Sequence, residues 1–189
     1  MHQKALEFIP MRVSTPLLIC LALLAPLRAT TLEQLTLDEM IQKSTAIVRA
    51  RITGSHSAAR GGNIYTYFQL QVLESWKGSA VTSAPREVAV PGGMADGIRQ
   101  SAAGAPELKP GREYVLFLWT SRTGLTQLMG LSQGLFNVSE EGSDGGLAQR
   151  PPASELMVDR SGNPVEDRSL SIQIRDLRAR VLQTVRAAK

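Results

Sequence analysis

The chain has few of the residues on which disulfide-rich secreted domains and metal enzymes depend. Its 189 residues include one cysteine, Cys20, and two histidines, His2 and His56. A disulfide framework needs at least two cysteines, and a zinc site needs several converging histidine, cysteine or carboxylate groups. The sequence therefore predicts no disulfide, no metal site and no cofactor, and it places His56 on the surface of a domain that is held together by an apolar core.

A strong charge of either sign is also missing. The chain has 21 basic and 17 acidic residues, a net charge of +4. Residues 1–29 contain three of the basic residues and one of the acidic residues, so the remainder has a net charge of +2. Nucleic-acid binding relies on clustered basic residues well beyond this balance. The sequence therefore predicts no nucleic-acid partner.

The chain has no apolar run long enough to span a membrane. Lys4 and Arg12 precede an uncharged segment, residues 13–27, whose uninterrupted apolar part is about 11 residues, against the roughly 20 that a spanning helix needs. This pattern is typical of an export signal. We expect cleavage after Ala29, an exported protein of the periplasm or extracellular space, and no membrane span after cleavage. A lipoprotein is disfavoured because Ile19, before Cys20, is not small.

One motif suggests catalysis, but its context does not fit. Residues 130–134, Gly-Leu-Ser-Gln-Gly, match the nucleophile elbow G-x-S-x-G, which requires a strand, a sharp turn and a helix, with an acid and a histidine later in the chain. No histidine follows Ser132, and residues 135–138 have the composition of a strand. We therefore predict a turn serine in a non-catalytic protein. The alternative is a secreted hydrolase that uses Ser132 or scattered carboxylates, such as Glu39, Glu74, Glu107 and Glu113.

Strand patterns dominate what is present. The strongest covers residues 64–76, where Tyr65, Tyr67, Gln69 and Gln71 alternate with apolar residues and therefore share one face. A further strand is predicted at 46–52, followed by a polar loop at 54–62. The near-continuous apolar run at 112–120 predicts a core strand buried on both sides. Further predictions are strands at 87–90 and 98–103 and a hairpin formed by 125–130 and 135–138.

Two helices complete the expected fold. Thr36 and Glu39 form a capping box, which predicts a short helix ending near Lys43. Apolar residues at helical spacing predict an amphipathic helix over 170–188: Leu170, Ile174, Leu177, Val181 and Val185.

The domain organisation follows from these elements. We expect a signal peptide at 1–29, a β-barrel domain at 30–140, a loop or ribbon linker at 141–168 and a C-terminal helix at 169–189 that packs on the barrel. Residues 146–150 and 156–160 are the extended pieces of the expected ribbon. The fold class is mainly β (α+β), with the two helices added to a small barrel.

Three segments carry a resemblance to known proteins. Residues 46–52, 64–78 and 108–118, the last two containing Trp-Lys-Gly and Lys-Pro-Gly-Arg, resemble a family of uncharacterised secreted bacterial β-barrel proteins and, more distantly, the netrin-like OB-fold of the tissue inhibitors of metalloproteinases. The resemblance implies a small OB-like barrel, closed or partly open, and a binding role that could involve proteases. Those inhibitors chelate zinc through an N-terminal cysteine, which this chain lacks after Thr30, so their mechanism is not carried over.

The candidate site is the polar face of the longest predicted strand. Tyr65 and Tyr67 interleaved with Gln69 and Gln71 present aromatic rings and amides on a curved sheet, which suits recognition. We therefore predict a secreted or periplasmic interaction module with a protein or glycan partner. The competing interpretation is that both tyrosines pack under the C-terminal helix.

Overall fold

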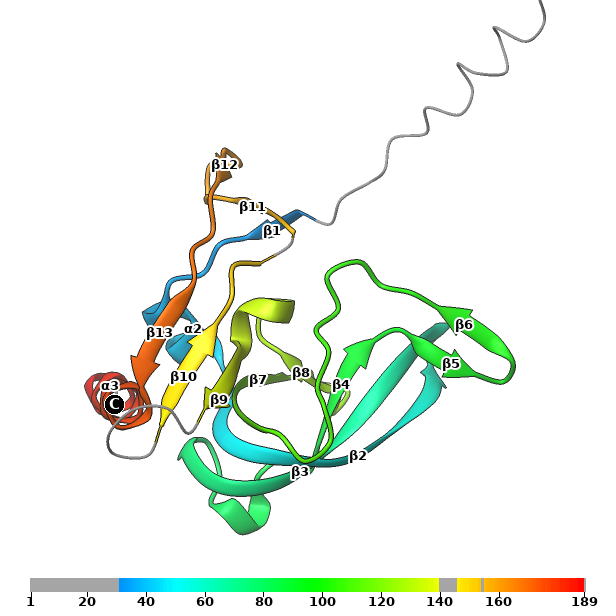
Figure 1. Cartoon of the computed structure of the whole chain (residues 1–189), viewed down its shortest axis with the longest axis horizontal. Coiled ribbons are helices and arrows are strands. Elements are labelled where there is room, and N and C mark those ends of the chain that lie inside the picture. The colour runs from blue at the N-terminus through cyan, green and yellow to red at the C-terminus, as the bar shows by residue number, and fades with distance from the viewer. Residues whose placement is uncertain (1–30, 140–145, 154, 189) are drawn as a thin grey trace, which may run out of the picture.

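The computed structural model describes residues 31–139, 146–153 and 155–188, and the predicted export signal with Cys20 lies outside this part. The described chain is mainly β with two α-helices, α2 (Leu37–Lys43) and α3 (Ile174–Ala187) (Figure 1), and two short 3₁₀ helices, η1 (Val81–Ser83) and η2 (Leu131–Gly134). None of the helices in the described ranges is long and apolar enough to span a bilayer. The predicted class, mainly β with a short N-terminal and a C-terminal helix, is confirmed.

Most strands belong to one sheet of eight, in the order β13-β10-β9-β7-β2-β3-β4-β8. Its members in chain order are β2 (Ala46–Arg60), β3 (Asn63–Lys77), β4 (Glu87–Pro91), β7 (Glu113–Thr120), β8 (Thr126–Leu128), β9 (Leu135–Ser139), β10 (Leu147–Arg150) and β13 (Leu170–Gln173). Strand β8 also pairs with β7, so five strands form a ring: β7-β2-β3-β4-β8-β7. The ring closes through one parallel pair, Ala89 of β4 with Gln127 of β8.

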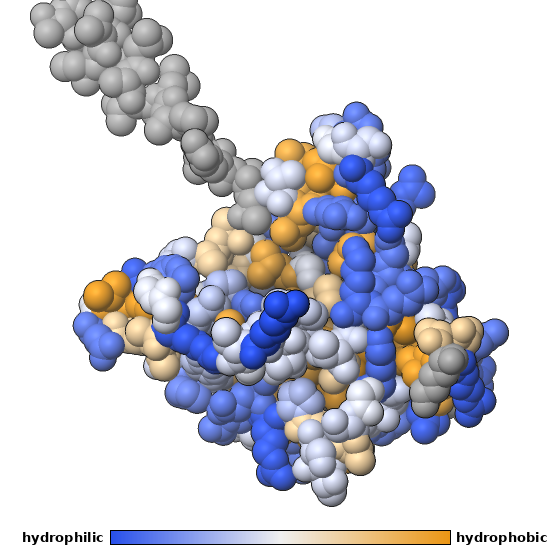
Figure 2. All heavy atoms as spheres, turned by 180° about the vertical axis from the view of Figure 1, so that it is seen from behind, coloured by the Kyte–Doolittle hydropathy of each residue, from blue (hydrophilic) through white to orange (hydrophobic). Residues whose placement is uncertain are grey.

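Five short strands of the described ranges lie outside this sheet. Strands β1 (Thr31–Glu33), β11 (Leu156–Val158) and β12 (Pro164–Val165) form a three-stranded sheet, in which β1 runs parallel to β11. Strands β5 (Gly93–Ala95) and β6 (Ile98–Gln100) form a projecting hairpin. Exposed Met94 and Ile98 lie on this hairpin, and Figure 2 shows apolar atoms at its tip.

Strand β7 separates two apolar cores. Tyr114, Leu116 and Leu118 point into the ring, while Val115 and Phe117 point to a second core on the outside of the sheet. A strand with buried residues on both faces reads as a continuous apolar run, because neither face meets water. The predicted core strand is therefore confirmed.

The second core lies between the sheet and the two helices. It contains Leu177 and Val181 of α3, Met40 of α2 and Trp76 of β3. The apolar stripe predicted for the C-terminal helix is thus the face that packs on the sheet. The predicted start at residue 170 is wrong, because residues 170–173 pair with β10 as strand β13 and the helix begins at Ile174.

Helix α2 begins as its sequence predicts. The Glu39 amide donates to the Thr36 hydroxyl at 3.2 Å, and the Thr36 amide donates to the Glu39 carboxylate at 2.9 Å. These reciprocal bonds satisfy amides that a helix start leaves without partners. The capping box is confirmed, and the helix ends at Lys43.

Three local predictions are wrong. Residues 54–60 are not a loop, because β2 continues to Arg60 and pairs with β3 up to the turn at Gly61 and Gly62. Strands β8 and β9 do not form a hairpin, because each pairs with β7 and η2 lies between them. The expected ribbon is not formed either, since β10 pairs with β9 and β13 while β11 pairs with β1 and β12. Cross-strand pairing outweighs local composition in all three.

Candidate functional site

The ring registers place five residues side by side, one from each strand. His56 pairs with Tyr67, Tyr67 with Ala89, Ala89 with Gln127 and Gln127 with Trp119. Residues next to Tyr67, Ala89, Gln127 and Trp119 belong to the ring core, so these four side chains point away from it, although Ala89 is only 2 % exposed. His56 lies on the same side as Tyr67, because their rings stack. We call His56, Tyr67, Ala89, Gln127 and Trp119 the outer row.

Aromatic stacking orders one end of the outer row. The imidazole of His56 stacks on the Tyr67 ring with centroids 5.2 Å apart and an angle of 15° between the rings. The Tyr65 ring lies 6.3 Å from that of Tyr67 at 54°. His56 Nδ1 is 3.9 Å from a carboxylate oxygen of Glu87, and the imidazole is 52 % exposed. The surface position predicted for His56 is confirmed, although the residue lies in a strand.

The four residues predicted as the site share the outer face of β3. Tyr65 and Tyr67 are half-buried, and Gln69 and Gln71 are exposed. Gln69 lies opposite Glu87 of β4, next to the Tyr67–Ala89 pair. The core under α3 takes Trp76 from β3 and neither tyrosine. The predicted residues Tyr65, Gln69 and Gln71 therefore lie on the same face of β3 as Tyr67, which belongs to the outer row.

Two hollows flank the seam where β4 meets β8. On one side, a cavity of about 280 Å³ has a mostly apolar lining that includes Ala89, Trp119, Leu131 and Pro91, and we call it the apolar hollow. On the other side, a cavity of about 590 Å³ is lined by Gln69, Leu70, Pro85, Arg86, Glu87 and Thr126, and we call it the polar hollow. A single residue pair joins the strands, so they separate on both sides of it.

The polar groups of this surface are unused. Within the described part of the chain, no hydrogen bond involves the hydroxyls of Tyr65 and Tyr67, the side-chain amides of Gln69 and Gln127, or the indole N–H of Trp119. The buried counterparts of these aromatic residues do bond: Trp76 Nε1 donates to Glu74 at 3.0 Å, and the Tyr114 hydroxyl accepts from the Lys109 amide at 3.0 Å. The outer surface therefore offers donors and acceptors that the fold itself does not need.

Sequence reasoning missed Trp119 and Gln127. Trp119 stands in an uninterrupted apolar run, where a core position is the natural expectation, yet it is 43 % exposed. The signal that could have separated it from its neighbours is its place near the strand end, before Thr120. Gln127 could not have been found, because its position depends on the ring closure.

Ser132 lies in η2, between two strands of the main sheet. Its hydroxyl donates to the Glu155 carboxylate at 3.3 Å. Strand β9 follows η2, where a nucleophile elbow requires a helix. Gly130 and Leu131 both have left-handed backbones, with φ of 59° and 54°. For leucine this conformation costs roughly 1–2 kcal/mol, and Leu131 lines the apolar hollow.

The scattered carboxylates are mostly engaged in ion pairs or caps. Arg49 lies 3.3 Å from Glu74 and 3.0 Å from Glu113. Burial alone would raise the pKa of Glu113, but hydrogen bonds from Arg51 and Arg49 outweigh it and lower the pKa. Hydrogen bonds from Thr36 lower the pKa of Glu39. A general acid needs a raised pKa, so these environments favour structural roles.

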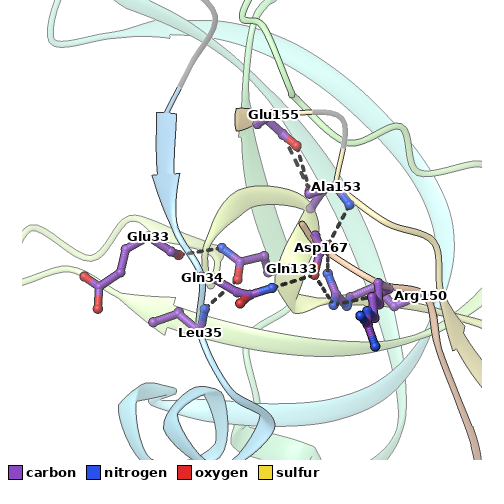
Figure 3. Close-up of polar contacts among 10 residues, drawn as sticks. Glu33, Gln34, Leu35, Gln133, Arg150, Ala153, Glu155 and Asp167 are labelled. Atoms are coloured by element: carbon purple, nitrogen blue, oxygen red, sulfur yellow. Dashed lines mark hydrogen bonds and ion pairs between the residues drawn. The ribbon is translucent and has the colours of Figure 1, made fainter. Parts of the chain in front are cut away.

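A buried polar cluster ties the N-terminal strand to the body (Figure 3). Arg150 and Asp167, with side chains 6 % and 4 % exposed, form a bidentate ion pair at 2.7 and 2.9 Å. The side-chain amide of Gln34 donates to the Asp167 carboxylate at 3.3 Å. Gln133 accepts from the Leu35 amide at 2.8 Å and donates to the carbonyl of Glu33 at 3.0 Å. We call Gln34, Gln133, Arg150 and Asp167 the clasp.

The clasp satisfies its own groups. Burial raises the pKa of Asp167, but hydrogen bonds from Arg150 and the Ala153 amide outweigh burial and hold the pKa below its ordinary value. Among the fully buried side-chain polar atoms of the clasp, Arg150 Nε is the one without a partner in the described part of the chain. No group of three potential metal ligands converges in the described ranges. The clasp therefore acts as a structural joint.

Comparison with known proteins adds no relative. The chain matches no known protein family, no curated protein and no solved structure. The chemistry of the outer row therefore has to be argued from its own residues.

Proposed function

We propose that this protein is an exported, non-catalytic binding module and that the outer row, together with Tyr65, Gln69 and Gln71, is its partner-binding surface. The observation that carries the proposal is the set of exposed and half-buried aromatic and amide side chains whose hydrogen-bonding groups have no partner within the described fold. Interfaces draw much of their binding energy from tyrosine and tryptophan side chains of this kind.

We further propose that the ring is an OB-like barrel, as the resemblance to netrin-like domains implies. The support is the order of its five strands, β2-β3-β4-β8-β7, which interleaves strands distant in the sequence and closes with one parallel pair. In the OB-fold, a five-stranded Greek-key barrel, the face of the second and third strands and two of the loops bind ligands. The long, bent β2–β3 hairpin supplies the His56, Tyr65 and Tyr67 part of that surface.

Backbone strain supports a function at the seam. Leu131 holds a left-handed backbone and lines the apolar hollow next to Trp119. Strained residues persist where the surroundings impose them, and they cluster at binding and active sites. The strain thus adds an independent observation at the same end of the outer row.

The second candidate is a hydrolase that uses Ser132, and one contact favours it. The Ser132 hydroxyl donates to a buried carboxylate, Glu155. A carboxylate partner alone does not reproduce the Ser-His-Asp arrangement, in which an imidazole takes the proton of the serine. A hydrolase screen with wild-type protein and Ser132→Ala tests this candidate, which predicts loss of activity in the variant.

The proposed surface is tested by changing both hairpin tyrosines. We expect Tyr65→Ser/Tyr67→Ser to leave the unfolding midpoint nearly unchanged and to abolish retention of the native partner from the envelope fraction. Gln183→Ala, at an exposed position of α3, is the control and should retain the partner. Unchanged retention by the double variant would exclude both tyrosines from the binding site. Unfolding of the double variant would assign them to the fold instead.

A further inference from the structure

We infer that the protein has a second binding site, in a cavity between the clasp and the two helices, and that this site takes a small amphiphile with an alkyl chain and one carboxylate. The site goes beyond the proposed function, because no residue of the outer row lines this cavity. The cavity has a volume of about 640 Å³, within the range of roughly 300–1,000 Å³ that is typical of small-molecule sites. We call it the clasp cavity.

The apolar part of the clasp cavity continues the second core. Phe136 is fully buried in that core and forms part of the cavity wall. Three partly buried residues that pack against the same core also line the cavity: Leu35, Leu37 and Ile172. Leu170, at the start of β13, lines it as well and is 37 % exposed. Figure 1 shows α2, α3 and β13 on the same side of the molecule. An alkyl chain in the cavity therefore covers apolar surface that the helices leave partly open to water.

Two guanidinium groups at the cavity are held in place by the fold. Arg150 and Asp167 of the clasp line the cavity, and their bidentate ion pair fixes both side chains. On the α3 side, Arg180 lines the cavity and donates from Nε at 3.0 Å and from Nη2 at 2.9 Å to the Asp38 carboxylate. Because these side chains are ordered before a ligand arrives, binding pays little for ordering them.

Two cationic groups at the clasp cavity keep donors that the described fold does not use. Arg168 lines the cavity and is exposed, and its side chain makes no ion pair or hydrogen bond with the described residues. Its carbonyl accepts from Arg150 at 3.2 Å, which ties its backbone to the clasp. The Arg150 side chain is 6 % exposed, and its Nε has no partner in the described ranges. A buried donor without a partner in the chain calls for one from outside it, such as a water molecule, an ion or a ligand.

The charge of the lining favours one negative charge on the ligand. Three arginines line the cavity, Arg150, Arg168 and Arg180, against two carboxylates, Asp167 and Glu166. The lining therefore carries an excess of one positive charge. Planar guanidinium groups bind carboxylates through paired, charge-assisted hydrogen bonds. A monocarboxylate neutralises this lining, whereas an alkylamine adds to its charge and a phosphate dianion exceeds it.

The test compares four ligands that share an octyl-length chain and differ in the head group: octanoate, 1-octanol, octylamine and octyl phosphate. Each is titrated calorimetrically into the protein. We expect octanoate to bind about tenfold more tightly than 1-octanol, because hydrogen bonds to charged groups are stronger than those between neutral groups. Arg168→Gln should weaken octanoate binding about fivefold, the upper range for an exposed ion pair, and should leave 1-octanol binding unchanged. The matched control is Arg186→Gln, at an exposed position of α3 that does not line the cavity, and it should bind octanoate as the wild type does.

A second variant tests the apolar wall. Leu170→Ser should weaken octanoate and 1-octanol alike, by about threefold, because it removes contact with the chain and not with the head group. Unfolding midpoints show whether each variant is folded. If Leu170→Ser does not fold, the contrast between octanoate and 1-octanol in Arg168→Gln still decides the question.

The other outcomes would overturn the inference. Equal binding of octanoate and 1-octanol by the wild type would remove the charged end of the site, and tighter binding of octyl phosphate or octylamine would rule out the carboxylate. Loss of octanoate binding in Trp119→Ala but not in Leu170→Ser would place the ligand in the apolar hollow. Absence of octanoate binding at millimolar concentration would remove the second site. Retention of the envelope partner tests the proposed function separately, and Arg168→Gln should leave it unchanged.

Discussion

The two tryptophans of the chain lie in opposite environments on neighbouring parts of one sheet. Trp76 is 4 % exposed, packs under α3 and donates its indole N–H to Glu74. Trp119 is 43 % exposed, borders the apolar hollow and has no hydrogen bond to the described residues. The same side chain therefore serves as core in one region and as presented surface in the other.

The clasp and the outer row differ in the same way in their polar side chains. Gln133 is buried, and its amide bonds two backbone groups of the N-terminal segment. Gln127 is only half-buried, and the described fold uses none of its amide groups. Buried polar groups have to be satisfied by the fold, whereas exposed ones remain available to a ligand. The hydrogen-bond partners of a side chain, and not its type, separate the groups that the described fold uses from those that it leaves available to a ligand.

The tryptophans give the largest expected effect. Trp76→Ala removes a large buried side chain and should lower the free energy of unfolding by about 3–5 kcal/mol. Trp119→Ala should cost less, about 1–2 kcal/mol, because 43 % of this residue is already exposed. Urea unfolding of both variants measures the difference. Equal losses would remove the distinction between core and presented tryptophan.

The ion pair of the clasp comes next. Asp167→Ala leaves the buried Arg150 charge without its carboxylate and should cost about 3 kcal/mol of unfolding free energy, near the lower end for such pairs because Arg150 keeps its bond to the Arg168 carbonyl. Arg160→Gln, which removes the exposed contact with Glu39, should cost no more than about 1 kcal/mol. Equilibrium unfolding at neutral pH compares them, and a small loss in Asp167→Ala would show that the clasp does not hold the fold together.

Gln133 of the clasp and Gln127 of the outer row allow the same comparison between two side chains of one type. Gln133→Ala leaves two backbone groups without their partner and should cost about 1–3 kcal/mol. Gln127→Ala should stay within about 0.5 kcal/mol of the wild type, because no bond within the described fold is lost. Thermal unfolding followed by circular dichroism suffices. A larger loss in Gln127→Ala than in Gln133→Ala would reverse the assignment.

The smallest expected effect concerns pH. The pKa of Asp167 is lowered in the folded protein, so its stabilising contribution is complete above its ordinary value of 3.8 and is lost as the pH falls through the folded pKa. The difference in stability between wild type and Asp167→Ala should therefore shrink only below about pH 3.8. Unfolding free energies measured from pH 6 to pH 2.5 test this. A difference that already shrinks at pH 5 would contradict the lowered pKa.

Features that depend on neighbouring residues in the sequence could be predicted. The alternation around Tyr67 predicted which face of β3 is presented, and the capping box at Thr36 predicted where α2 begins. The seam was out of reach, because Ala89 and Gln127 lie 38 positions apart in the sequence and meet only when the ring closes. Trp119 was hidden for the same reason, since its exposure depends on the strand that lies beside it. Strand β2 extends to Arg60 because it pairs with β3. The small and polar residues of this segment do not indicate a strand by themselves.

The most direct test of the account follows the two indole N–H signals in a proton–nitrogen NMR spectrum, each assigned with a Trp→Phe variant. During titration with the ligand of the outer row, the Trp119 signal should shift and saturate while the Trp76 signal stays in place. A saturable shift of Trp76 alone, or ligand binding that moves neither signal, would contradict the claim that the outer row is the binding surface.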